Sequence, residues 1–171
     1  MLSETVQKAI NEQIHAEFYS FYLYLSIAGW FTTGHLDGFA HWMQIQAQEE
    51  YGHAMKLFGY VHDRGGAVQL ETIDGPPSQW ASPSVACEAV LNHERHISER
   101  INNLVNLASS ERDNATATFL QWYVNEQIEE EATADTLFHQ VKMLEGSPQG
   151  LFMLDRELAA RPAATAAAAA E

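Results

Sequence analysis

Apolar residues between positions 39 and 60 recur at alternating steps of four and three, which is the spacing of one buried face of an α-helix. This segment therefore predicts a long helix that packs in a bundle. Glu50 and His53 lie in the middle of the same face. An ionised carboxylate in apolar surroundings costs on the order of several kcal/mol unless a cation or a proton compensates its charge. The rest of the chain must supply that compensation.

The composition indicates one globular domain. The chain has 171 residues, of which 46% are hydrophobic and 19% are charged, so it can build a sizeable core. Most of its five prolines lie between the periodic segments, which favours long helices and an all-α fold. We predict a folded domain over residues 1–160 and a flexible, Ala-rich tail over residues 161–171.

Charge and cysteine content narrow the function. The formal net charge of −14 argues against a nucleic-acid partner and favours the attraction of cations, although a solvated acidic surface is the simpler explanation of charge taken alone. Cys87 is the only cysteine, which excludes an intrachain disulfide or a Cys-rich metal site. The first residues lack the features of a signal peptide, and no window approaches the roughly 20 apolar residues of a membrane span. We therefore expect a cytoplasmic protein that does not bind membranes.

Four segments have the periodicity of long helices. The first begins near Ser3 and ends near Thr33, the second covers about residues 36–64, and the third begins at Ser82. The fourth follows a turn near residues 112–114 and ends before Gly146, and a short fifth helix is expected over residues 150–159.

The linker over residues 65–81 predicts the topology. It is rich in glycine and proline, and it joins two helices that are each roughly 43 Å long at 1.5 Å per residue. Fully extended, the linker reaches about 56 to 61 Å. It can therefore run the length of the bundle, which would make the second and third helices parallel and the connection a long crossover.

Each long helix carries polar residues on its core-facing stripe. Counted from one end of the bundle, one such residue on each helix lies about 13 to 17 positions along it, or roughly 20 to 26 Å, so the four meet in one layer. These four are Glu17, Glu50, Glu94 and Gln127. A single buried glutamate or histidine is more often structural, but six coincident positions favour a metal site. Four carboxylates with one imidazole suit two ions of iron or manganese better than copper or structural zinc. The six residues are Glu17, Glu50, His53, Glu94, Gln127 and Glu130.

The chain resembles the non-haem ferritins, and the bacterial ones in particular, up to about Leu158. The segments that carry the resemblance are residues 11–17, residues 47–53, Glu94 and residues 119–130. It implies a ferritin-like four-helix bundle with a di-iron ferroxidase centre. In that centre one iron is held by Glu17, Glu50 and His53, Glu50 also bridges, and the second iron is held by Glu94 and Glu130 beside Gln127.

The resemblance implies two further features. Glu49, Glu126 and Glu129, together with Glu130, match a third iron position that bacterial ferritins add. Tyr24 matches a tyrosine next to the centre that can supply an electron, although a tyrosine in a bundle core often only fills space.

Departures from related families narrow the assignment. Gln127 and Glu130 stand where bacterioferritins and di-iron oxygenases have a second Glu-x-x-His. Neither Tyr51 nor Gly52 offers the methionine that binds haem in bacterioferritins, so no haem is expected. The single cysteine excludes the iron domain of rubrerythrins. The DNA-protecting mini-ferritins build their site between subunits, unlike the predicted site. The acids of the animal ferritin entry channel are replaced here by Thr116, Ala117 and Thr118.

The implied function is iron storage with ferroxidase activity. Fe(II) would be oxidised by O2 or H2O2, and the ferric product would mineralise inside a homo-oligomeric shell of twenty-four subunits. One alternative is a non-storage di-iron peroxidase or oxygenase that retains its metals. The other is a metal-free helical interaction protein whose polar layer only fixes the register of the helices.

Overall fold

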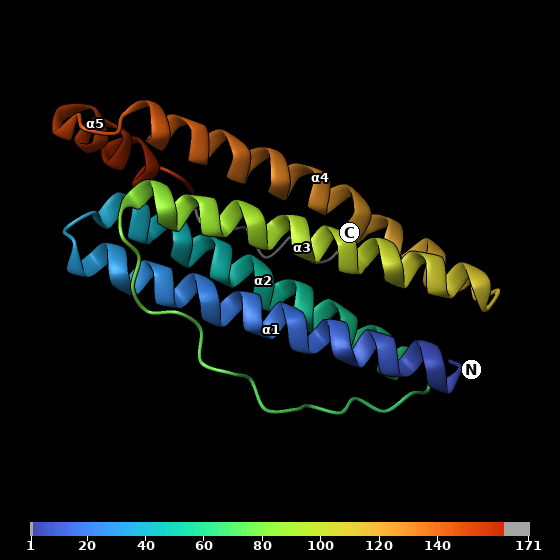
Figure 1. Ribbon diagram of the computed structural model, residues 1–171. Helices are drawn as coiled ribbons and strands as arrows, with labels where there is room; N and C mark the ends of the chain where they lie inside the picture. The colour runs from blue at the N-terminus through green and yellow to red at the C-terminus, as the bar shows by residue number, and fades with distance from the viewer. Residues whose placement is uncertain (1, 163–171) are drawn as a thin grey trace.

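The computed structural model of the protein describes residues 2–162 and is built from α-helices (Figure 1). The predicted all-α class is confirmed, and the four long helices begin and end within about two residues of the predicted positions. The helices are α1 (Glu4–Thr33), α2 (Asp37–Asp63), α3 (Pro83–Ser110), α4 (Asn114–Met143) and α5 (Pro148–Leu158).

Side chains next to the helices set where four of them begin. Ser3, Ser82, Asp113 and Ser147 each accept a hydrogen bond from a backbone amide in the first turn of α1, α3, α4 and α5, respectively. These bonds satisfy amides that have no partner within the helix. Prolines in the first turn of α3 and α5 add a backbone angle that already suits a helix.

The four long helices form a bundle in which α1 packs on α2 and α3 packs on α4 (Figure 1). The apolar core falls into two clusters, one toward each end of the bundle. Phe31 and Phe39 belong to the cluster near α5, and Ile10, Leu57 and Ile101 belong to the other. The polar layer predicted from the sequence lies between these clusters.

The linker between α2 and α3 runs along the bundle beside α1, as the green chain in Figure 1 shows. Side chains of α1 hold it there. Asn11 donates a hydrogen bond to the Ala67 carbonyl and accepts one from the Gln69 amide, both at 3.1 Å. Toward the other end of α1, Ser26 donates to the Pro77 carbonyl at 2.7 Å. The long crossover and the parallel course of α2 and α3 are therefore confirmed.

The short helix α5 packs against the beginning of α2. The Asp155 carboxylate accepts a hydrogen bond from the Phe39 amide at 3.0 Å, and a Cβ atom at Gly38 would lie only 1.7 Å from the Asp155 carbonyl oxygen. A residue with a side chain at position 38 would therefore force the two helices apart. Of the predicted tail, residues 163–171 lie outside the described part of the chain.

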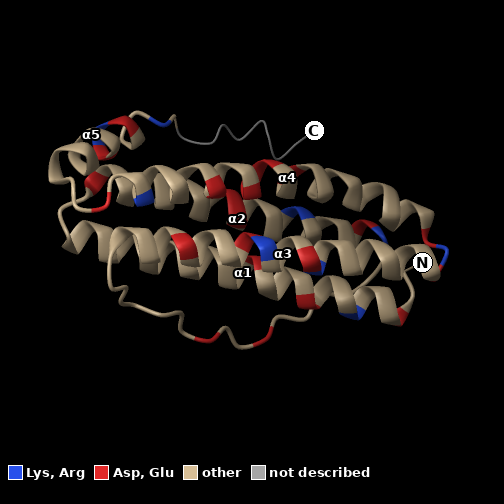
Figure 2. Ribbon diagram, turned by 45° about the horizontal axis from the view of Figure 1, so that its top comes forward, with Lys and Arg blue, Asp and Glu red and all other residues tan. Residues whose placement is uncertain are grey.

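Acidic residues are spread along the helices, with few basic residues between them (Figure 2). Among residues 2–162, none of the helices is both long enough and apolar enough to cross a membrane.

Candidate metal centre

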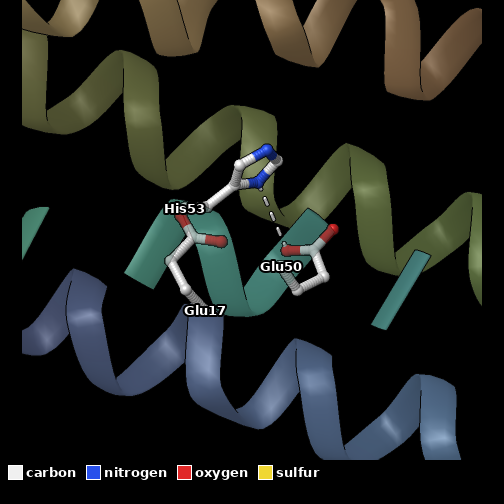
Figure 3. A group of neighbouring side chains, drawn as sticks. All are labelled: Glu17, Glu50 and His53. Atoms are coloured by element: carbon white, nitrogen blue, oxygen red, sulfur yellow. Dashed lines mark ion pairs between the residues drawn. The ribbon is translucent and has the colours of Figure 1, made fainter. Parts of the chain in front are cut away.

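Three predicted ligands converge where α1 faces α2 (Figure 3). Glu17, Glu50 and His53 are buried, and each offers one ligand atom within 4.8 Å of those of the other two. The His53 Nδ1 atom lies 3.6 Å from Glu50 Oε2. Glu50 and His53 share a face of α2 because they are three residues apart, and the neighbouring helix brings Glu17 to that face.

Two carboxylate oxygens in this group lack a donor. Glu17 and Glu50 are each 1% exposed, and Glu17 Oε2 and Glu50 Oε1 have no hydrogen-bond partner among the described residues. The other Glu17 oxygen accepts a hydrogen bond from the Gln13 amide at 2.8 Å. A buried oxygen without a donor is costly, and a coordinated cation would satisfy it. The donor set therefore fits a metal ion.

The other half of the layer comes from α3 and α4. Glu94 is 1% exposed, and its carboxylate accepts hydrogen bonds from the Tyr24 hydroxyl and, at 3.2 Å, from the Gln127 amide. Glu130 is 7% exposed and accepts a hydrogen bond from the Gln46 amide at 2.7 Å. Tyr24, Gln127 and Gln46 thus fix how the two carboxylates are oriented.

A second group of possible ligands lies beside the first. His53, Glu126 and Glu130 also bring ligand atoms within 4.8 Å of one another, so His53 borders both groups. Neither group among residues 2–162 includes Glu49 or Glu129. Each of these two acids directly precedes a core-facing glutamate in the sequence. Its side chain therefore points about 100° away around the helix axis.

Glu129 is exposed to solvent, and Glu49 is half-buried. The Glu49 carboxylate forms an ion pair with the Arg161 guanidinium at 2.9 Å. Of the acids predicted for a third iron, only Glu126 and Glu130 therefore join a described ligand group.

Burial and mutual repulsion raise the pKa of the inner carboxyl groups. Desolvation raises the pKa of Glu50 well above its usual range, and the charges of Glu94, Glu17 and Glu130 raise it further. Desolvation raises the pKa of Glu94 to about 7, against the lowering effect of hydrogen bonds from Tyr24 and Gln127. Without metal, the layer therefore holds protons near neutral pH, and metal binding would release them.

Several contacts at the site were not among the predicted site residues. Gln46 lies on the stripe of Glu50, one turn earlier, and that position was a usable signal for it. The Trp122 ring meets the His53 ring edge-on at 5.3 Å, and the Tyr123 hydroxyl donates to the His53 carbonyl at 2.8 Å. No periodicity could have indicated Arg161, because it lies beyond the last helix.

Known proteins resemble this chain over most of its length. The family described as "Ferritin-like domain" matches residues 7–144. A bacterial non-heme ferritin of Bacteroides fragilis is 44% identical over 161 residues, which are 94% of this chain and all of that relative. A probable bacterial non-heme ferritin-like protein of Haemophilus influenzae is 36% identical over 92% of this chain and 96% of its own.

Solved structures agree with these matches. An open-pore ferritin from the archaeon Archaeoglobus fulgidus superimposes with a TM-score of 0.94 at 47% identity, covering 95% of this chain and all of that one. A closed form of the Archaeoglobus ferritin, engineered by mutagenesis, gives a TM-score of 0.95 at 46% identity over 96% of this chain and all of its own. Sequence, fold and the buried carboxylate layer lead to one assignment: the chain belongs to the ferritin family.

Proposed function

We propose that this protein oxidises Fe(II) at its buried carboxylate layer and stores the ferric product. The observation that carries the proposal is the pair of buried, partnerless oxygens on Glu17 and Glu50, whose carboxylates lie beside His53 inside a layer of glutamates from all four helices. A layer that only fixed helix register would be expected to satisfy its own polar atoms. The family membership and the ferritin names of the relatives support iron storage.

In this proposal two ferrous ions are the substrate. Glu17, Glu50 and His53 hold the first ion, Glu94 and Glu130 hold the second, and Glu50 bridges them. Carboxylates stabilise Fe(III) more than Fe(II), so these residues favour the oxidised product. Gln127 keeps the Glu94 carboxylate in position through its 3.2 Å hydrogen bond.

The oxidation balances with dioxygen as the oxidant. Each of two Fe(II) ions gives up one electron, and O2 takes up both electrons and two protons to become H2O2. The chain holds both ions close together, so that the two electrons can leave in one event. The carboxyl groups that are protonated in the metal-free layer release protons as the ions bind, and this supplies protons near the reaction.

Storage requires an enclosed cavity, so we include a homo-oligomeric shell of twenty-four subunits in the proposal. Met143, Phe152 and Met153 are 77%, 61% and 72% exposed in the single chain, at the end of α4 and on α5. Subunit contacts would remove these large apolar side chains from water. We also retain the expectations of a cytoplasmic location and of no bound haem.

Stopped-flow oxidation of Fe(II) tests the proposed activity. Two Fe(II) per chain are mixed with air-saturated buffer, and the ferric absorbance and oxygen uptake are followed for the parent and for Glu50→Ala. The parent should oxidise iron at least about a hundredfold faster than Glu50→Ala, because that variant loses the bridging ligand. Glu88→Ala, an exposed acid on α3, is the matched control and should match the parent. Equal rates in all three proteins would refute a role for the buried layer.

A further inference from the structure

Arg161 lies beyond α5, and its side chain returns to α2 beside the carboxylate layer. One guanidinium nitrogen lies 2.9 and 3.2 Å from the two carboxylate oxygens of Glu49, and the other lies 2.5 Å from the Gln46 side-chain oxygen. The guanidinium carbon is 4.9 Å from the centre of the Trp42 ring. Arg161 thus contacts an acid, an amide and an aromatic face at once.

The backbone of Arg161 is held as well as its side chain. A ring nitrogen of His41 lies 2.9 Å from the Arg161 carbonyl oxygen. Upstream, the hydrogen bond between Asp155 and the Phe39 amide fixes α5 on α2. The side chains of Arg161 and Glu49 are only 24% and 25% exposed, so this pair is more shielded from solvent than a typical surface ion pair.

Gln46 connects this ion pair to the candidate metal centre. Its oxygen accepts from Arg161, which turns its amide nitrogen toward Glu130, 2.7 Å away. Glu130 belongs to the ligand group with His53 and Glu126. Arg161 is therefore separated from a candidate ligand by one side chain.

We propose that Arg161 is a built-in competitor for metal at the outer edge of the centre, where it neutralises Glu49 until a divalent cation displaces it. This inference rests on the proposed function. A divalent ion that binds Glu49 must approach a guanidinium, whose charge is permanent, and must take the place of its hydrogen bonds. Arg161 thereby weakens an outer metal position relative to the two inner ones, which favours passage of an ion over its retention there.

Anaerobic calorimetry with Zn²⁺, which cannot be oxidised, tests the competition. The assembled parent protein is titrated, and its weakest binding event is compared with that of Arg161→Gln. The loss of the guanidinium should tighten this outer event by about three- to tenfold, or add an outer ion that the parent lacks, because a charged hydrogen-bonded competitor has been removed. Arg156→Gln, an exposed site on α5, removes the same charge and should leave the titration unchanged.

A double-mutant comparison identifies the partner. In a Glu49→Gln background, Arg161→Gln should no longer change the binding of the outer ion, because the group for which Arg161 competes is gone. Arg161→Lys keeps the charge but loses the planar donor group, so its affinity should lie between those of the parent and Arg161→Gln. It also provides a test if the glutamine variant fails to assemble.

The outcomes separate this inference from the proposed function. Tight binding of about two inner ions with no difference between Arg161→Gln and Arg156→Gln would overturn the competition and leave the metal centre standing. Weaker outer binding in Arg161→Gln would overturn it too, because Arg161 would then support the ion. A parent that binds no Zn²⁺ in its interior would overturn both the inference and the proposed centre.

Discussion

At the scale of single residues, Glu94 would link the stability of the protein to the proposed metal chemistry. The carboxyl group is buried, and its pKa lies near 7 instead of the ordinary 4.5. The group is therefore neutral in the metal-free protein at acidic pH and becomes a buried charge as the pH rises. A bound cation would reverse that penalty, because it stabilises the charged form.

The raised pKa of Glu94 predicts that the metal-free protein loses stability between about pH 4.5 and pH 7. In that window the native carboxyl group binds more protons than the unfolded one, so the free energy of unfolding falls as the pH rises through 7. Glu94→Gln should reduce this fall by up to about 3 kcal/mol and should be the more stable protein at the upper pH. The apparent melting temperatures of the chelator-treated parent and variant, recorded across this pH range, measure the difference. Equal pH dependence in parent and variant would contradict the prediction.

Glu94 should also affect the rate of Fe(II) oxidation. Glu94→Gln replaces a charged ligand by a neutral one without changing its shape much, so the fold should persist while the second ion is held poorly. The initial rate at two Fe(II) per chain should fall by about tenfold or more. An unchanged rate, with the fold verified by circular dichroism, would remove Glu94 from the centre.

Tyr24 is tested through its hydrogen bond to Glu94. The ring is fully buried, and the bond from its hydroxyl lowers the pKa of Glu94. Tyr24→Phe should therefore raise the pKa of Glu94 further and slow iron oxidation most below pH 7. If Tyr24 also donates an electron, a freeze-quenched sample of the parent should contain a tyrosyl radical that the variant lacks. Tyr22→Phe, at a half-exposed position, is the control. A radical-free parent with kinetics identical to those of Tyr24→Phe would leave Tyr24 a packing residue.

At the scale of whole elements, the linker stays extended because α1 supplies its hydrogen bonds. The segment has no ladder of its own, and Asn11 satisfies both a carbonyl and an amide of it. Asn11 is only 8% exposed, so the loss of its side-chain hydrogen bonds should destabilise the linker more than the loss of exposed ones would.

Asn11→Ala should loosen the linker locally without unfolding the bundle. The amides near Gln69 should exchange hydrogen about tenfold faster, which corresponds to about 1.4 kcal/mol of local opening. Amides in the core of α2 should keep their protection. Asn103→Ala, at an exposed position on α3, is the control. Unchanged exchange near Gln69 would show that Asn11 does not hold the linker.

The elements were more predictable than the contacts between their ends. Helix periodicity identified α1 to α4 because long apolar stripes have one structural solution in water, and linker length identified the crossover because a short hairpin needs no such length. The same stripes predicted that Glu17, Glu50 and Glu94 face the core, where all three are buried. The ion pair of Glu49 could not be predicted in this way, because its partner Arg161 lies beyond α5 and no local sequence pattern indicates such a distant contact.

At the scale of the whole molecule, the division of the core explains where chemistry can occur. Two apolar clusters close the ends of the bundle, and the carboxylate layer lies between them, away from solvent. The apolar clusters at the two ends of the bundle then stabilise the helices, and the layer between them can contain buried carboxylates that reduce stability. The proposed role of this layer in metal binding is compatible with a fold that persists without metal.

Iron loading of the assembled protein tests the proposed storage function most directly. Fe(II) is added in air in repeated small portions, the sample is passed through a size-exclusion column, and iron and protein are quantified in the same fractions. A storage protein should elute as a large particle that carries iron far above three ions per chain and in proportion to the amount added. Iron that saturates at about two ions per chain and stays there through further additions would contradict storage and would identify a di-iron enzyme that retains its metals.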